Sequence, residues 1–204
     1  MIVWTNQPYS VYQQLKKTGR FVCDPRQALD HEFTDYAAAY HWMQIQLKRK
    51  VGLPPADVTT PIWAWYRRNW HHQRPDFRDR HDYADQVCLE VEVAESQILL
   101  SDFEHWNFVL NDWRISMVTS EAAWEQDQVW FMSLPKAQQQ RVKHHSWQQI
   151  FDITQRHGDW EKNGDTVQGC FWELRWPQVR RAWRLQGRER AVELEVSRTE
   201  PFYD

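Results

Sequence analysis

One acidic residue, Glu173, sits inside an aromatic, strand-like run near the C-terminal end of the chain, CFWELRW over residues 170–176. A carboxylate in apolar surroundings loses hydration, which nearby cations or dipoles must replace. Such a group is ion-paired, has a raised pKa or takes part in chemistry. Two interpretations of Glu173 therefore stay open: a catalytic acid, or a strand residue bonded to an arginine such as Arg181.

A dense group of arginines follows Glu173 and could hold a negatively charged ligand. Arginines at this density can clamp phosphate groups with paired N–H donors. The alternative is that they cover the solvent face of two strands and pair with Glu193 and Glu195. The group consists of Arg175, Arg180, Arg181, Arg184, Arg188 and Arg190, with Arg67, Arg68, Arg74, Arg78 and Arg80 elsewhere in the chain.

Histidines and aspartates crowd residues 71–82 and offer nitrogen and oxygen ligands for a metal. Their spacing matches no standard motif, and adjacent histidines in a loop usually point apart, so we predict a solvated polar loop without a metal. A metal-dependent enzyme centred on this loop is a third alternative. The residues concerned are His71, His72, Asp76, Asp79, His81 and Asp82.

The bulk composition indicates a globular chain. With 204 residues and 42% hydrophobic content, it can bury one sizeable core, and we expect a single domain over residues 1–204. The formal charge of −3 argues against a broadly basic nucleic-acid coat, and the 14 tryptophans suit core packing or stacking on planar rings. Three cysteines without CxxC spacing and the absence of a long apolar run predict a cytoplasmic protein with no membrane partner.

The hydrophobic pattern predicts an α+β fold, with small twisted β-sheets flanked by helices. We expect strands at 2–7, 62–66, 87–93, 167–175, 179–185 and 191–196. We expect helices at 8–17 and 34–50, a short helix capped by Ser101, and mainly helical structure over 120–151.

Alternation along the strands assigns side chains to faces. In the second strand, Trp63 and Trp65 share one face, opposite Ile62, Ala64 and Tyr66. In the third, Glu90 and Glu92 lie on a solvated face and are weak catalytic candidates. Helical spacing places Trp42, Trp106 and Trp113 in the core, whereas Trp65 and Trp172 stay undecided.

Short tryptophan-rich motifs spread over nearly the whole chain resemble a bacterial family. They are WTNQ at 4–7, PIWAWY at 61–66, LSDF at 100–103, LNDW at 110–113 and FWEL at 171–174. On these motifs the chain is similar to the domain-of-unknown-function family three-eight-four-one. That family name supplies no activity.

The order of elements also resembles the ADP-ribosyltransferase fold, especially its nucleic-acid-modifying toxin branch. The resemblance implies split sheets that grip NAD, with Thr5 on the first strand contacting the nicotinamide side and Tyr66 or Trp65 stacking on the ring. Glu173 would be the catalytic acid, and Gln7 and Arg67 would contribute to NAD binding. Gln168 lies five residues before Glu173 on the opposite strand face, so the sequence does not assign it an acceptor-orienting role.

The resemblance implies an enzyme that consumes NAD and transfers ADP-ribose to a nucleic acid or a protein. Loss of nicotinamide leaves a positively charged ribose that a fixed carboxylate can stabilise, while arginines hold the pyrophosphate. A bacterial toxin or phage-defence effector, with an antitoxin protein as partner, would fit this activity. The alternative is a non-enzymatic RNA- or protein-binding module that uses exposed tryptophans and the arginine patch.

Overall fold

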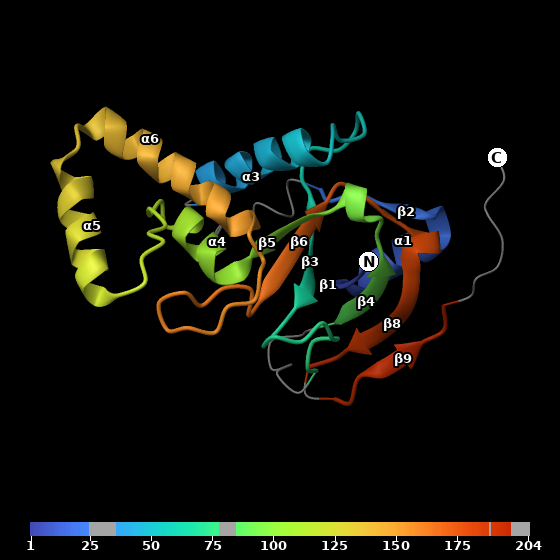
Figure 1. Cartoon of the computed structure of the whole chain (residues 1–204). Helices are drawn as coiled ribbons and strands as arrows, with labels where there is room; N and C mark the ends of the chain where they lie inside the picture. The colour runs from blue at the N-terminus through green and yellow to red at the C-terminus, as the bar shows by residue number, and fades with distance from the viewer. Residues whose placement is uncertain (25–35, 78–84, 188, 197–204) are drawn as a thin grey trace.

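The computed structural model describes residues 1–24, 36–77, 85–187 and 189–196 of the chain (Figure 1). The strands are β1 (Ile2–Pro8), β2 (Arg20–Phe21), β3 (Ile62–Arg67), β4 (Gln86–Glu92), β5 (Leu99–Asp102), β6 (Val167–Phe171), β7 (Leu174–Arg175), β8 (Val179–Leu185) and β9 (Val192–Leu194). The α-helices are α1 (Tyr9–Thr18), α3 (Ala37–Lys50), α4 (Phe103–Leu110), α5 (Glu121–Ser133) and α6 (Lys136–Ser146). Short 3₁₀ turns are η2 (Glu95–Gln97), η3 (Trp147–Phe151) and η4 (Trp176–Gln178).

One antiparallel sheet carries most of the strands, in the order β5-β6-β3-β1-β4-β8-β9. A separate two-stranded sheet pairs β2 with β7. The predicted α+β class is confirmed, although one large sheet stands where the sequence predicts small split sheets. The predicted strands at 2–7, 62–66, 87–93 and 179–185 are confirmed to within one residue at each end.

Helix α1 covers one face of the central strands. Val11, Tyr12 and Leu15 recur at helical spacing and are buried against the sheet. The helix ends at Gly19, whose φ of 73° is left-handed and whose N–H donates to the Leu15 carbonyl at 2.8 Å. An L side chain is strained at this angle, so the glycine sets the end of the helix, as predicted.

The two faces of the large sheet carry different cores. Val3 and Leu89 belong to the cluster under α1, and we call this side the α1 face. Trp63 on the other side packs with α3, α4 and η3, while Trp183 packs with buried Cys88. We call this second side the tryptophan face. The predicted alternation of β3 and β4 is confirmed, but the far side of β4 is not simply solvated, because the free thiol of Cys88 is fully buried there.

The strand predicted over 167–175 is confirmed for 167–171 and 174–175, but it is wrong as one continuous strand, because it is interrupted at Trp172 and Glu173. Phe171 is opposite Ile62, the first residue of β3, so the ladder has no partner for the residues that follow. The indole N–H of Trp172 donates to the Gly52 carbonyl at 2.9 Å, and its ring is buried beside α3. Residue 173 therefore lies in a turn between β6 and β7.

Two predictions around α4 are also wrong. The N-cap is Asp102, which accepts from the His105 N–H at 2.8 Å, while Ser101 is a fully buried residue of β5. Trp113 is 60% exposed, because the helix ends at Leu110 and leaves it outside the core. Burial of Trp106, which is 3% exposed, is confirmed.

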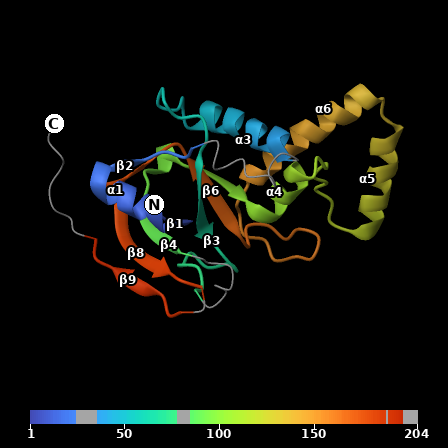
Figure 2. The ribbon, with the colours of Figure 1, turned by 180° about the vertical axis from the view of Figure 1, so that it is seen from behind.

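Helices α5 and α6 form a hairpin, residues 121–146, that we call the arm. Both ribbon views show α5 at the end of the molecule farthest from the sheet, with α6 leading back to it (Figures 1 and 2). The mainly helical structure predicted for residues 120–151 is confirmed. The described residues contain no helix that is both long enough and apolar enough to cross a membrane.

Candidate functional site

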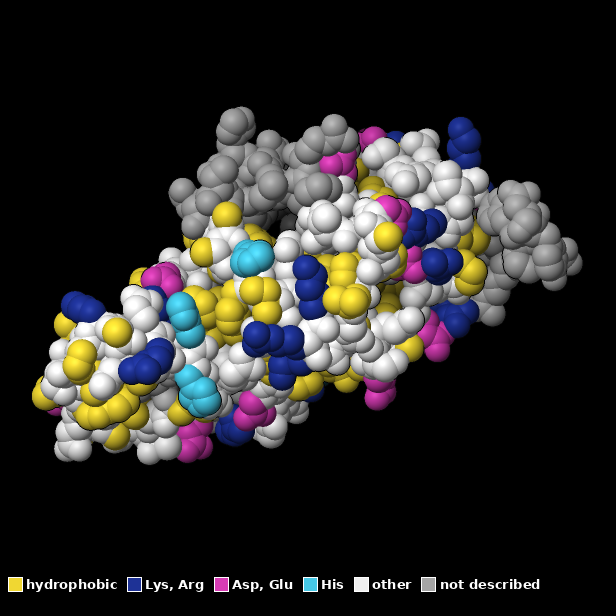
Figure 3. Space-filling view, turned by 90° about the horizontal axis from the view of Figure 1, so that it is seen from above, with side chains coloured by type: hydrophobic (Ala, Val, Ile, Leu, Met, Phe, Trp, Pro, Cys, Tyr) yellow, Lys and Arg dark blue, Asp and Glu magenta, His cyan; other side chains and the backbone are white. Residues whose placement is uncertain are grey.

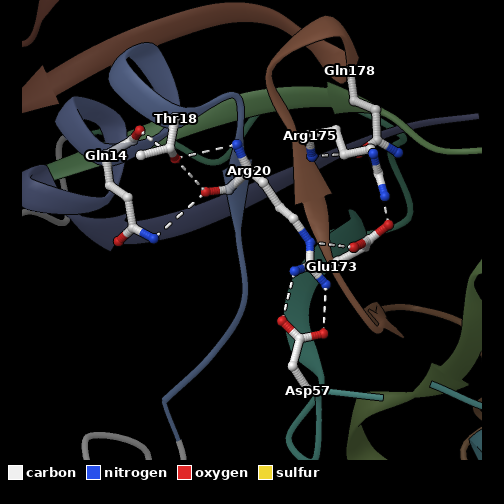
Figure 4. A network of polar contacts seen from close by, with 7 residues as sticks. All are labelled: Gln14, Thr18, Arg20, Asp57, Glu173, Arg175 and Gln178. Atoms are coloured by element: carbon white, nitrogen blue, oxygen red, sulfur yellow. Dashed lines mark hydrogen bonds and ion pairs between the residues drawn. The ribbon is translucent and has the colours of Figure 1, made fainter. Parts of the chain in front are cut away.

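Both oxygens of the Glu173 carboxylate already have arginine partners (Figure 4). Arg20 Nε donates to Oε2 at 2.7 Å, and Arg175 Nε donates to Oε1 at 2.7 Å. The same Arg20 donates to the two carboxylate oxygens of Asp57 at 2.6 and 2.9 Å. We call these four residues the Glu173 corner. Glu173 is therefore ion-paired, as one of the two interpretations predicts. Its partners are Arg20 and Arg175, and not Arg181, because the interruption after β6 turns Glu173 toward β2.

The charge of Glu173 is balanced within this corner. Burial raises the pKa of Glu173, but hydrogen bonds from Arg175 and Arg20 outweigh that effect, and the net pKa lies below its ordinary value. The side chain is 20% exposed. A carboxylate held between two guanidiniums joins β2, β7 and the loop before β3, as an ion-pair joint would. Its catalytic role stays a prediction.

A cavity of about 360 Å³ lies beside the Glu173 corner. Its lining mixes apolar side chains of the loop after α3 with polar groups near β7, and it does not include the other predicted NAD-binding residues. The lining residues are Val51, Leu53, Pro54, Pro55, Val93, Gln97, Phe171, Trp172, Glu173, Arg175 and Gln178.

Thr5 and Gln7 form a closed hydrogen-bonded unit within the sheet. Thr5 has no exposed surface, and its hydroxyl donates to the Trp63 carbonyl at 2.7 Å. The same hydroxyl accepts from Gln7 Nε2 at 2.8 Å. Both side chains are therefore engaged with protein groups, and their roles toward NAD stay predictions.

Tyr66 and Arg67 lie at the end of β3 opposite to the Glu173 corner. Val167 is opposite Arg67 in the β3–β6 ladder, whereas Phe171, which precedes the corner, is opposite Ile62. Arg67 Nη1 donates to the carbonyls of residues 153 and 164 at 3.0 and 2.8 Å, so it fixes the loop before β6. The structure does not bring Glu173 together with Thr5, Tyr66 and Arg67.

A different set of side chains meets on the tryptophan face. Strand pairing places Ser101 opposite Gln168, Gln168 opposite Trp65, Trp65 opposite Trp4, and Trp4 opposite Glu90. Directly opposed residues project to the same side of an antiparallel sheet. We call this set of five residues the cross-strand row. It runs over β5, β6, β3, β1 and β4, so it joins the first strand, the aromatic strand and a late strand.

Two adjacent members of the row bury polar atoms that have no partner. Gln168 is 6% exposed and Ser101 is fully buried. In the described part of the chain, neither Gln168 Nε2 nor Ser101 Oγ has a hydrogen-bond partner. Unpaired buried donors and acceptors cost about 1–3 kcal/mol each, so such groups usually meet water or a ligand.

The surroundings of the row supply aromatic surface and charge. The half-buried Trp65 ring meets Phe103 edge-on at 5.2 Å, and the Arg68 guanidinium lies 5.3 Å from its centroid. At the other end, the Trp4 indole N–H donates to Glu90 Oε2 at 3.0 Å. The row thus combines a donor, a hydroxyl, aromatic rings and a half-buried carboxylate.

The arginines near the C-terminus mostly pair with acids across the sheet. Each ion pair joins neighbouring parts of the fold, so the solvent-face interpretation describes this group better than a phosphate clamp does. The predicted pairing with Glu193 is confirmed for Arg181, and Arg188 lies outside the described residues. The pairs are Arg180 with Glu92, Arg181 with Glu193, and Arg184 with Asp85.

In the described part of the histidine-rich loop, the side chain of His72 packs against the first strand. His72 Nε2 lies 2.8 Å from the Ile2 carbonyl, and its ring contacts those of Trp4 and Tyr66. In residues 1–24, 36–77, 85–187 and 189–196, no group of three or more His, Cys, Asp or Glu side chains could hold a metal. Asp79, His81 and Asp82 lie outside those ranges.

Local sequence patterns do not identify Gln168, Ser101 and Glu90 as one group. Alternation predicts a solvated face for Glu90, and nothing near Gln168 in the sequence indicates its neighbours across the sheet. The strand order supplies the missing relation, since a residue's neighbours across a sheet depend on pairing and register. The spacing of Trp63 and Trp65 was the one available signal, because it placed both rings on a common face.

Comparison with known families gives one match. A family model described as Domain of unknown function (DUF3841) matches residues 2–180. Searches of curated proteins and of solved structures find no match. The predicted family is confirmed, and the chain belongs to the DUF3841 family.

Proposed function

We propose that the protein is an NAD-dependent ADP-ribosyltransferase that binds the nicotinamide end of NAD along the cross-strand row. The observation that carries this proposal is the pair of unpartnered buried atoms, Gln168 Nε2 and Ser101 Oγ, beside the Trp65 indole. A carboxamide on a planar ring has the matching acceptor, donor and aromatic surface. The adjacency of β1, β3 and β6 supports an ADP-ribosyltransferase-like fold.

The chemistry requires a carboxylate near the nicotinamide ribose. When the bond between ribose C1′ and the ring nitrogen breaks, nicotinamide leaves with the electron pair and the ribose becomes an oxocarbenium ion. An acceptor nucleophile then forms a bond to C1′ and loses its proton. Glu90 lies two strands from Trp65, about 10 Å at ordinary strand spacing, and is the carboxylate of the row.

Matched substitutions separate the two carboxylates. Purified protein is incubated with labelled NAD and separate RNA, DNA and protein acceptors, while released nicotinamide and transferred label are measured. We expect Glu90→Gln to lower turnover about 100-fold or more, as loss of electrostatic stabilisation does, and Glu173→Gln to retain it. Loss of turnover only in Glu173→Gln would show that Glu173, and not Glu90, is the catalytic carboxylate. No NAD loss with any acceptor would overturn the proposal.

The acceptor assay also distinguishes a toxin or phage-defence enzyme from a non-enzymatic binding module. Transfer to RNA, DNA or protein would fit a toxin or phage-defence effector and would leave room for an antitoxin that covers the site. The second candidate, a non-enzymatic binding module, is favoured by four exposed tryptophans: Trp113, Trp124, Trp130 and Trp160. The paired arginines of β8 favour a protein over a nucleic acid as its partner, because the guanidiniums of Arg180, Arg181 and Arg184 already bind carboxylates of the fold.

A further inference from the structure

Helix α5 has no buried residue, although it carries several large apolar side chains. Val129 is 73% exposed, Met132 is 65% exposed, and Trp124 and Trp130 are both nearly half exposed. Hydrophobic and polar side chains lie around the whole circumference of the helix. A helix of this composition is normally covered on more than one side.

One side of α5 is held by the body of the protein. Asp127 accepts from Arg114, and Ser116 Oγ donates to it at 2.5 Å. The Arg114 guanidinium lies 4.5 Å from the Phe131 ring centroid. These contacts fix the orientation of α5, so its opposite side is presented to solvent in a defined direction.

The solvent side carries a seam with helix-packing spacing. Ala122, Glu125, Val129 and Met132 are separated by three, four and three residues and therefore form one stripe along the helix. All four are exposed. In the space-filling view, hydrophobic and basic side chains lie next to each other at the end of the molecule formed by the arm (Figure 3).

We propose that the arm is a homodimer interface, in which the α5 seam packs antiparallel against the α5 seam of a second copy of this chain. The charges favour this occupant and this direction. A parallel pair would place Glu121 and Glu125 against the same acids of the second copy. An antiparallel pair places Glu125 opposite Val129 of the second copy and Glu121 opposite Ser133, the last residue of α5, within side-chain reach of Lys136 at the start of α6.

The contact is isologous, because each copy supplies both the acid and the base. Glu121 and Lys136 are exposed in the single chain, so both are available for the pairing. The seam is about 20 Å long, which is enough for four layers of facing side chains. Burial of Val129 and Met132 would supply most of the affinity, and the two charge pairs would set the register.

The first experiment measures the mass of the full chain in solution by sedimentation equilibrium. The chain is 24.9 kDa, and we expect twice this mass at about 100 µM protein, with Val129→Glu giving the monomer. Val192→Glu is the matched control, because Val192 is 55% exposed on β9, away from the arm. A monomeric wild-type chain, or a dimer that Val129→Glu leaves intact, would overturn the proposal.

A charge exchange tests the register. Glu121→Lys and Lys136→Glu should each raise the dimer dissociation constant about fivefold, since two symmetric exposed pairs are lost in each case. The double variant restores both pairs and should return the constant to the wild-type value. If the double variant is weaker than either single one, the antiparallel register is wrong. These measurements need no NAD, so they are independent of the proposed activity.

Discussion

The Glu173 corner and the cross-strand row differ in how their polar groups are satisfied. In the corner, Glu173 accepts from Arg20 and Arg175, and Arg20 also binds Asp57. In the row, Gln168 Nε2 and Ser101 Oγ have no partner in the described residues. A saturated set of charges holds elements of the fold together, whereas unpaired buried atoms can still form hydrogen bonds with a ligand or a water molecule. The acid that stands out in the sequence is thus ion-paired in the fold, whereas the unpaired amide nitrogen is recognised only from the strand pairing.

The largest effect should come from Gly164, which sets the loop that leads into β6. Its φ is 72°, and an added Cβ would lie 2.6 Å from the Ile153 carbonyl oxygen. We expect Gly164→Ala to lower the free energy of unfolding by about 2–4 kcal/mol in chemical denaturation, and to disturb the row more than the corner. Gly158→Ala is the control, because its Cβ would meet only ordinary contacts, at 3.6 Å or more. Equal stability of the two variants would contradict the strain argument.

Glu173→Gln should lower the free energy of unfolding by about 1–2 kcal/mol, because two charge-assisted hydrogen bonds are weakened in a partly buried site. NAD turnover at permissive temperature should be retained. Glu193→Gln, which alters an exposed pair with Arg181, should change stability little. If Glu173→Gln is as stable as wild type but inactive, the Glu173 corner is a functional site and not a structural ion-pair joint.

Gln168→Leu should raise the free energy of unfolding, whereas Glu173→Gln lowers it. The substitution removes a buried amide whose Nε2 has no partner among the described residues, and it keeps a similar volume, so we expect a gain of about 1 kcal/mol together with loss of NAD binding. Gln139→Leu is the matched control, since buried Gln139 donates to the Leu134 carbonyl at 2.8 Å and should lose stability. A destabilised Gln168→Leu would show that the amide is already satisfied.

The smallest effect is the pH dependence of the corner. The pKa of Glu173 is lowered in the folded protein from its ordinary value of 4.5, so its ionisation stabilises the fold above that value. This contribution is lost as the pH falls through the folded-state pKa. The difference in unfolding free energy between wild type and Glu173→Gln should therefore shrink below pH 4.5, as measured by denaturation at several pH values. A constant difference down to about pH 3 would assign the loss to packing instead of charge.

The sequence predicted local structure well where periodicity and stop signals agree. The α1 helix has Val11 and Leu15 four residues apart and a glycine at its end, and both features depend only on nearby residues. The strand break at Trp172 was missed because it depends on where β3 begins, about 110 residues earlier in the chain. The exposure of Trp113 was missed because the end of α4 has no glycine or proline signal.

The candidate site was less predictable, because its contacts also join residues that are far apart in the sequence. Glu173 could be identified as unusual from its neighbours, but its partner Arg20 is 153 residues away and no local pattern points to it. The cross-strand row is made of residues from five strands, each ordinary in its own segment. Only the pairing order brings Gln168 next to Trp65 and Trp65 next to Trp4.

Two buried thiols allow local opening of the large sheet to be measured. Burial raises the pKa of Cys88 on β4 to about 12, and it also raises the pKa of Cys170 on β6. Only an accessible thiolate reacts readily with alkylating reagents. Each of the two cysteines is therefore not alkylated until its strand separates from its neighbours. The rate at which each cysteine is labelled in native buffer therefore reports how often that part of the sheet opens.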